Sequence, residues 1–232
     1  MRVYIVSATR TGSTMLDLML ASHKDVTTFG ELMQYGKRKC GFCGFDCDFW
    51  KAYEQGIMNA GIIIDSSKKV EWVAKHYKPE DKIIQLVRNG FDRLLTYKER
   101  FGKVQSRDII KWIKKEKKIK DFLKGKAHIT VKYEDICEGN GLQLCCDYLE
   151  IDYHPEMKQF WMFEHHGLPG SKKTYALVKS YHSRPLTPTE KKFVDEHGFN
   201  TNIRKQVNFM DKEEQALWAK HGEKFNRKMG YE

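Results

Sequence analysis

The sequence predicts an α/β fold in which a central parallel sheet of about four to five strands is flanked by helices on both faces. Apolar runs rich in β-branched residues alternate along the chain with amphipathic, helix-like stretches, and turn residues separate them. The 232 residues, of which 41% are hydrophobic, suit one such domain better than two.

The expected elements follow one another in strand–helix order. Strands are expected at 2–7, 61–65, 82–87 and 128–132. Helices are expected at 13–22, 69–77, 91–101, 107–123, 141–149 and 211–227. Because parallel sheets bind ligands beyond the carboxyl ends of their strands, we expect functional residues in the loops that follow the strands. These loops begin after Val6, Ile64, Val87 and Val131.

The charge of the chain favours an anionic partner. Lysine and arginine number 41 against 31 acidic residues, which gives a net charge of +10. A nucleotide, a nucleic acid, a membrane surface or an acidic glycan would each fit, although a lysine-rich solvated surface gives the same count. The first residues indicate a strand and not a secretory signal, and no apolar run approaches the roughly 18 residues of a membrane helix. We therefore expect a cytoplasmic protein without a membrane span.

The loop between the first strand and the first helix has the composition of a phosphate-binding turn. Gly12 allows an anion to approach the backbone, and the amides that open the helix point toward it. Ser13 and Thr14 add hydroxyl donors, and Arg10, followed by Thr11, adds a cation with a bidentate fork. A Walker A loop requires a lysine directly before the hydroxyl residue, whereas here glycine stands there. The pattern predicts an anion site of another kind.

A second anion site is predicted at the end of the third strand. Arg88 closes that strand, and Thr96 follows eight residues later on the next helix. A guanidinium and a hydroxyl on adjoining elements would clamp a phosphomonoester. The simpler alternative pairs Arg88 with Asp92 and leaves Thr96 facing solvent.

Together the two segments resemble the PAPS-dependent sulfotransferases, enzymes that use 3′-phosphoadenosine 5′-phosphosulfate (PAPS) as sulfuryl donor. In that family the 5′-phosphosulfate loop has a cation, a small residue, glycine and two hydroxyl residues, as in 10–14 here. Its 3′-phosphate site has an arginine and, eight residues later, a serine, which Arg88 and Thr96 resemble. The resemblance implies a P-loop NTPase-like sulfotransferase fold, PAPS as donor, 3′-phosphoadenosine 5′-phosphate (PAP) as product, and no required metal. It also implies a single domain over 1–232, with a nucleotide-binding and catalytic core at 1–185 and a helical C-terminal extension at 186–232.

The resemblance covers three further segments. The Asp-Ser-Ser-Lys sequence at 65–68 resembles an element near the transfer site of bacterial members, which implies roles for Ser67 and Lys68. The basic segment 165–173 occupies the place of a late loop over the 3′-phosphate, which implies contacts from Lys172 and Lys173. The Tyr-Glu-Asp sequence at 133–135 resembles a segment that we interpret as structural.

Sulfuryl transfer needs a base for the acceptor hydroxyl and positive charge on the oxygen that leaves. The Gly-Glu pair at Gly30 and Glu31 resembles the segment that supplies a glutamate base in several branches, so Glu31 is the expected base and Arg10 the expected stabiliser of the leaving oxygen. His165 and His166 are the alternatives, because imidazole titrates in the useful range.

We expect a small-molecule or glycan acceptor with a hydroxyl, but the sequence does not identify it: sugar, lipid, peptide and small phenol all remain open. Four aromatic residues either line the acceptor pocket or belong to the core: Phe42, Phe45, Phe49 and Trp50. Two other functions compete with sulfuryl transfer. One is a P-loop-type small-molecule or nucleotide kinase, and the other is a basic nucleic-acid-binding protein, for which no sequence motif is recognised.

Six cysteines are too few for a disulfide scaffold in a chain of this length. Cys40, Cys43 and Cys47 cluster, and the favoured interpretation is a packed loop of free thiols, with a disulfide or a zinc site as alternatives. A zinc site would need a fourth ligand, and three residues could supply it: His23, Asp46 or Asp48.

Overall fold

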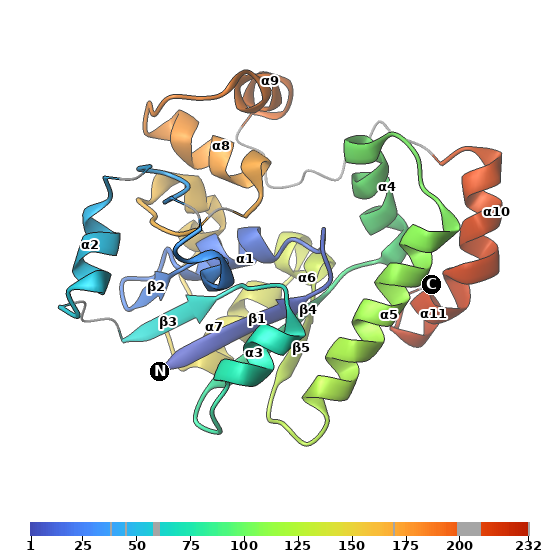
Figure 1. Cartoon of the computed structure of the whole chain (residues 1–232), viewed down its shortest axis with the longest axis horizontal. Coiled ribbons are helices and arrows are strands. Elements are labelled where there is room, and N and C mark those ends of the chain that lie inside the picture. Colours follow the sequence, from blue (N-terminus) through green and yellow to red (C-terminus); the bar gives the residue numbers. More distant parts are fainter. Residues whose placement is uncertain (38, 45, 58–60, 169, 199–209, 232) are drawn as a thin grey trace.

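The computed structural model describes residues 1–232 except 38, 45, 58–60, 169, 199–209 and 232. Its centre is a five-stranded parallel sheet in the order β2-β3-β1-β4-β5 (Figure 1). The strands are β1 (Arg2–Ser7), β2 (Val26–Thr28), β3 (Ile62–Asp65), β4 (Lys82–Val87) and β5 (Ile129–Lys132). The predicted fold class is confirmed, and each predicted strand is present to within one residue. β2 has only three residues, and a strand of that length shows no recognisable pattern in the sequence.

The strands alternate in the face to which they point, as the period of two requires. Val3 and Ile5 of β1 join a large apolar cluster with α1 (Ser13–Leu20), α7 (Gly141–Leu149) and η2, a 3-10 segment (Pro155–Met162). Tyr4 and Val6 point the other way and pack with α3 (Val70–His76) and α5 (Ser106–Leu123). Helices therefore cover both faces of the sheet, and the loops at its carboxyl end stay open to a ligand.

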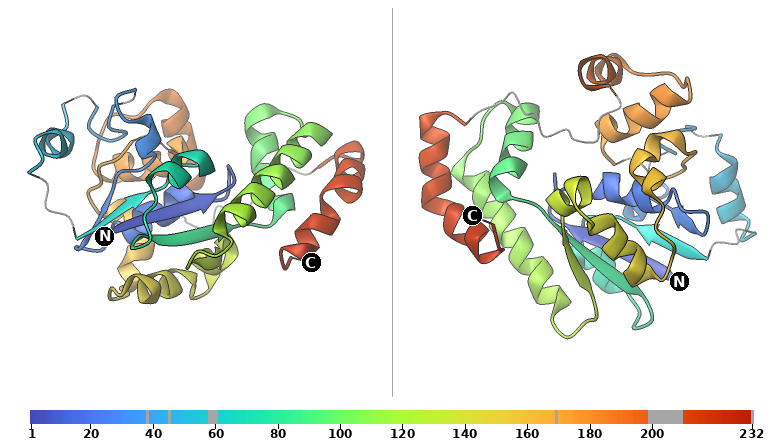
Figure 2. Two further views of the ribbon diagram at one scale, coloured as in Figure 1. Left: turned by 60° about the horizontal axis from the view of Figure 1, so that its bottom comes forward. Right: turned by 180° about the vertical axis from the view of Figure 1, so that it is seen from behind.

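A third apolar cluster includes Trp112 of α5, which is almost fully buried. Residues of α4 (Gly90–Phe101), α10 (Lys212–His221) and α11 (Glu223–Lys228) pack in the same cluster, and these helices stand on the side of the molecule away from α2 (Figure 2). Trp112 stacks on Trp218 with ring centroids 5.7 Å apart. The single helix predicted at 211–227 is wrong, because the chain turns at Gly222 between α10 and α11.

The C-terminal helices also hold the turn that follows β4. The side-chain oxygen of Asn226 accepts a hydrogen bond of 2.7 Å from the amide of Gly90. The hydroxyl of Tyr231 donates to Glu134 at 3.0 Å, and the other carboxylate oxygen of Glu134 accepts from the amide of Asn89. Residues near the chain end thus fix the backbone directly after Arg88.

Six helical elements were not predicted individually: η1 (Leu32–Gln34), α2 (Asp48–Glu54), α6 (Tyr133–Glu138), η2 (Pro155–Met162), α8 (Lys172–Tyr181) and α9 (Pro188–His197). All have ten residues or fewer, and α9 lies within the predicted helical extension at 186–232. It carries a capping box formed by Thr187 and Glu190, with Pro188 at its first position. That signal was readable in the sequence. Among the described residues, no helix combines the length and the apolar character that crossing a bilayer demands.

Asp17 joins α1 to the two strands beside it. Its side chain is fully buried, and its two carboxylate oxygens accept hydrogen bonds from the hydroxyls of Thr28 at 2.5 Å and Ser66 at 2.9 Å. The Thr28 hydroxyl in turn accepts from the amide of Gly30 at 2.8 Å. The network fixes the turn that carries Glu31. Burial raises the pKa of Asp17 to about 7, although the two hydroxyl donors oppose that shift.

We predict that Asp17 makes the stability of the protein depend on pH. Its folded pKa lies above the ordinary value of 3.8, so the folded state binds more protons between these two values. The stabilisation is complete below the unfolded pKa and is lost as pH rises through about 7. In urea titrations from pH 5 to pH 8, the free energy of unfolding of the wild type should fall relative to Asp17→Asn, by roughly 1 kcal/mol per pH unit up to neutrality.

The matched control is Asp152→Asn, which removes an exposed carboxyl. The difference in free energy of unfolding between this variant and the wild type should stay constant over the same pH range. A constant difference for Asp17→Asn as well would contradict the raised pKa of Asp17.

Candidate active site

A cleft of about 660 Å³ lies at the carboxyl end of the sheet. The loops after β1, β3, β4 and β5 all contribute to its lining, as the sequence predicted. Eight of the lining residues are basic: Arg10, Lys68, Lys69, Arg88, Arg93, Lys111, Lys115 and Lys173. Only Glu31 and Glu99 among the described lining residues are acidic. This excess of positive charge suits an anionic ligand.

Gly12 shapes the first loop, and no other residue would fit its position. It adopts φ +98°, and a Cβ there would lie 2.4 Å from the ring of Tyr133. Ser13 and Thr14 open α1 and line the cleft. The Thr14 hydroxyl also accepts a 3.1 Å hydrogen bond from the amide of Ser171, which ties the late loop to the first one.

Arg10 lines the cleft from a left-handed backbone conformation, with φ 67°. Such a conformation costs a non-glycine residue roughly 1 kcal/mol and recurs at functional sites. Thr11 is placed differently from the prediction. Its buried hydroxyl donates to the carbonyl of Ala8 at 2.8 Å, so the side chain holds the loop and does not face the cleft.

Two buried arginines from the neighbouring β4–α4 segment hold this loop. Arg88 Nη1 donates to the carbonyl of Arg10 at 3.2 Å, and the Arg88 guanidinium lies 4.4 Å from the centre of the Tyr133 ring. Arg93 Nε donates to the carbonyl of Thr9 at 2.7 Å. Arg88 Nε and Arg93 Nη1 are buried and have no hydrogen-bond partner among the described residues.

Buried N–H groups without a partner are costly, so these two atoms are candidate donors to a bound anion. Burial lowers the pKa of Arg93 to about 10, which leaves the side chain cationic at neutral pH. Arg93 was missed in the sequence analysis. Its position five residues after Arg88, on the helix that carries Thr96, was the available signal. Thr96 also lines the cleft, and its hydroxyl donates to the carbonyl of Asp92 at 3.2 Å.

The remaining predicted donor contacts divide into two groups. Lys68 and Lys173 line the cleft, and Lys173 forms an ion pair with Glu99. Lys172 is exposed on α8, and the described lining does not include it. Ser67 is buried, and its hydroxyl accepts from the amide of Met33 at 3.0 Å, so it supports the wall and does not face the cleft.

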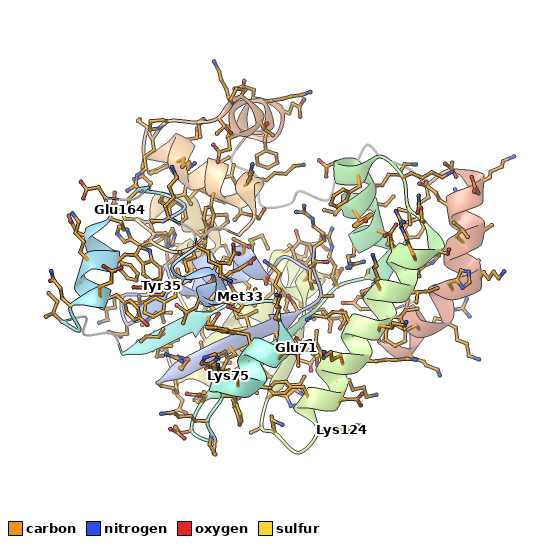
Figure 3. The ribbon with its side chains drawn as sticks, in the orientation of Figure 1. Met33, Tyr35, Glu71, Lys75, Lys124 and Glu164 are labelled. Carbon is orange, nitrogen blue, oxygen red and sulfur yellow. The ribbon has the colours of Figure 1, made fainter. Side chains whose placement is uncertain are left out.

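Glu31 lies in the cleft wall beside Met33, which is labelled in Figure 3. Its side chain is 14% exposed, and one carboxylate oxygen forms an ion pair with Lys68 Nζ. The other accepts a hydrogen bond from the side-chain amide of Gln34. Gly30, at φ +63°, lets the chain turn here, and a Cβ on it would lie 2.4 Å from the carbonyl oxygen of Leu168.

The two histidines considered as alternative bases lie outside the described lining of the cleft. His165 is buried, its Nε2 lies 2.7 Å from the carbonyl of Phe160, and burial lowers its pKa to about 4. His166 faces sulfur atoms: its Nδ1 lies 3.3 Å from Sγ of Cys43 and of Cys47. Both placements argue for Glu31.

The described aromatics from the cysteine loop pack on other rings and do not line the cleft. Phe42 stacks on Tyr175 at 4.1 Å, and Phe49 stacks on His166. Trp50 lies 5.4 Å from the ring of Tyr35, which is labelled beside α2 in Figure 3. Phe45 lies outside the described residues.

All six cysteines carry free thiols. Cys40, Cys43 and Cys47 lie together with His166 as a candidate metal-binding group. This group contains none of the three residues that the sequence analysis names for the fourth position. Asp46 and Asp48 pair with Lys51, and His23 stacks on His154.

The fold is shared with solved sulfotransferase structures. The sulfotransferase domain from the Synechococcus PCC 7002 olefin synthase is 16% identical, with a TM-score of 0.52 over 84% of this chain and 93% of that one. Mouse sulfotransferase SULT7A1, complexed with PAP, is 14% identical, with a TM-score of 0.51 over 94% of this chain and 88% of that one. This likeness establishes the sulfotransferase fold predicted from the sequence. No protein-family model and no curated protein sequence matches the chain.

We predict that Gly12→Ala impairs anion binding in the cleft. The added methyl group clashes with Tyr133, against which Arg88 stacks, and so displaces part of each anion subsite. Millimolar pyrophosphate should raise the melting temperature of the wild type, because a ligand that binds only the folded state stabilises it. The variant should lose that increase.

The control is Gly102→Ala, at a glycine with φ +82° and open space around it. It carries the same backbone strain without the clash, so its melting temperature should fall while its response to pyrophosphate remains. An equal response in all three proteins would contradict the assignment of the first loop.

Proposed function

We propose that this chain is a PAPS-dependent sulfotransferase that transfers a sulfuryl group to a hydroxyl of a small-molecule or glycan acceptor. One observation carries the proposal. A single basic cleft contains a glycine turn at a helix start and, across from it, buried arginines whose Nε and Nη1 atoms have no hydrogen-bond partner among the described residues. A nucleotide with anionic groups at both ends fits this arrangement.

The donor binds with its 5′-phosphosulfate at the turn. Backbone amides at the start of α1 and the Ser13 hydroxyl hold the 5′-phosphate, aided by the helix dipole. Arg88 and Thr96 hold the 3′-phosphate, while Arg93 and Lys173 add positive charge. AMP lacks a 3′-phosphate, so the site at Arg88 discriminates PAP from AMP.

Transfer proceeds by in-line displacement. The acceptor oxygen forms a bond to sulfur while the bond from sulfur to the bridging oxygen breaks, and PAP leaves with that oxygen and its negative charge. Arg10 stabilises the charge, since a guanidinium stays protonated at neutral pH. The acceptor proton passes to Glu31.

Lys68 couples the base to the donor. It pairs with Glu31 and lines the same cleft, so an arriving sulfonate competes for its ammonium group. When Lys68 turns toward the sulfonate, a carboxylate oxygen of Glu31 becomes available to the acceptor hydroxyl. The ion pair thus keeps Glu31 from accepting the acceptor proton until the donor is bound.

The kinase alternative lacks support in the described residues. Mg²⁺ needs carboxylate ligands near the phosphates, and the carboxylate of Asp65, at the end of β3, already has other partners. Its carboxylate accepts from the amide of Ser67 at 2.8 Å and from Trp72 Nε1 at 2.9 Å. Nucleic-acid binding would leave unexplained why the glycine turn and the buried arginines line one cleft of about 660 Å³.

We predict that the protein binds PAP more tightly than AMP, and that Arg88 is responsible. Calorimetric titration should give a preference for PAP of about 10- to 100-fold, as expected for hydrogen bonds to a charged phosphate. In Arg88→Ala the two nucleotides should bind about equally.

The control variant is Arg107→Ala, at an exposed arginine on α5; it should keep the preference. Equal binding of PAP and AMP to the wild type would refute the donor assignment.

For Glu31→Gln we predict a loss of turnover of about 100- to 10,000-fold, the usual contribution of a general base, with PAP binding retained. Turnover is measured as transfer of radiolabelled sulfate from PAPS to a panel of acceptors, and PAP binding is measured by calorimetry. Glu164→Gln, an exposed carboxylate outside the cleft, should keep wild-type turnover. Full activity of Glu31→Gln on an acceptor that the wild type uses would remove Glu31 as the base.

A further inference from the structure

The cysteine cluster forms a second site, separate from the cleft. We propose that it binds one zinc ion through a Cys3His ligand set that consists of Cys40, Cys43, Cys47 and His166. The site goes beyond the proposed transferase activity and does not depend on it.

The ligand atoms lie close to the separations that zinc requires. All four lie within 4.8 Å of one another, and His166 Nδ1 lies 3.3 Å from Sγ of Cys43 and from Sγ of Cys47. Tetrahedral zinc with its usual bond lengths places sulfur and nitrogen ligands about 3.6 Å apart. Small side-chain movements therefore bring the four atoms onto one ion.

The backbone of the loop is built to present two sulfurs to one point. Cys40 and Gly44 exchange backbone hydrogen bonds of 3.1 and 3.2 Å, which closes a tight turn. Gly44 adopts φ +84°, a conformation that a side chain would strain. The turn brings Cys43 back over Cys40, and Cys47 follows at the residue before α2, buried like Cys40.

His166 reaches the cluster from a segment 119 residues further along the chain than Cys47. Its ring stacks on Phe49 with centroids 5.2 Å apart and planes 8° from parallel, and this contact holds the imidazole edge toward the sulfurs. The amide of Gly41 donates to the carbonyl of Gly167 at 2.8 Å beside it. The fourth ligand is thus fixed by packing before a metal binds.

The charge around the cluster favours a metal over a disulfide. Three thiolates, a neutral imidazole and Zn²⁺ carry a net charge of −1. Arg184 Nη1 lies 3.6 Å from Cys43 Sγ, and its Nη2 donates to Glu164, labelled in Figure 3, at 3.1 Å. A cation beside the sulfur offsets the remaining charge, as outer groups do at metal sites. A disulfide would use two sulfurs and leave the third, the imidazole and the arginine without a common role.

The zinc ion would join two segments that flank the cleft. The residue after Gly167 is Leu168, whose amide donates to the carbonyl of Phe29 at 2.9 Å, next to Gly30 and Glu31. Binding releases the thiol protons and couples metal affinity to folding of this region. We therefore assign the ion a structural role in the wall that carries Glu31.

The test is the metal content of the full-length protein purified without chelator. Inductively coupled plasma mass spectrometry should find one zinc per chain. After removal of zinc by a chelator, added Co²⁺ should give the visible absorption of tetrahedral cobalt with thiolate ligands. Cys43→Ser and His166→Gln should each lower zinc affinity by at least about 10- to 100-fold, and Cys137→Ser, outside the cluster, should leave it unchanged.

Measurements on the wild-type protein alone can refute the proposal, so the test does not depend on whether the variants fold. A metal-free protein that takes up no Co²⁺ would refute it, as would mass spectrometry showing a disulfide among the three cysteines. PAP binding that persists in a zinc-free protein would leave the zinc assignment unaffected, because metal content and nucleotide binding are measured separately.

Discussion

Two arginines of the β4–α4 segment hold the backbone of the β1–α1 loop, and the geometry of the cleft depends on these contacts. Arg88 donates to the carbonyl of Arg10, and Arg93 donates to the carbonyl of Thr9. Each guanidinium keeps a further buried N–H without a partner among the described residues. The same side chains therefore fix the position of the β1–α1 loop and, in the proposed function, supply donors to the 3′-phosphate.

Other parts of the chain support this arrangement from outside. Asn226 and Tyr231, near the chain end, fix the backbone after Arg88, so the C-terminal helices act on the cleft without entering it. On the opposite wall, the buried carboxyl of Asp17 positions Thr28 and, through it, the Gly30 turn beside Glu31. Two buried polar networks thus support the cleft, one beside Arg88 and one beside Glu31.

The fold and the anion loops could be predicted because they depend on local pattern. Gly12, Arg88 and Thr96 stand at strand ends and helix starts that periodicity locates, and they all line the cleft. The pattern predicts less well which way a side chain points. The Thr11 hydroxyl turns to a carbonyl within its own loop, whereas Ser67 meets the amide of Met33 and His166 meets cysteines more than 100 residues away in sequence. Spacing along the chain carries no information about such contacts.

A crystal structure of the protein with PAP tests the central claim most directly. The account predicts the 5′-phosphate on the amides that open α1, at Gly12 to Thr14, and the 3′-phosphate within hydrogen-bond distance of Arg88 Nε. PAP bound in the reverse direction, or outside the cleft, would contradict it.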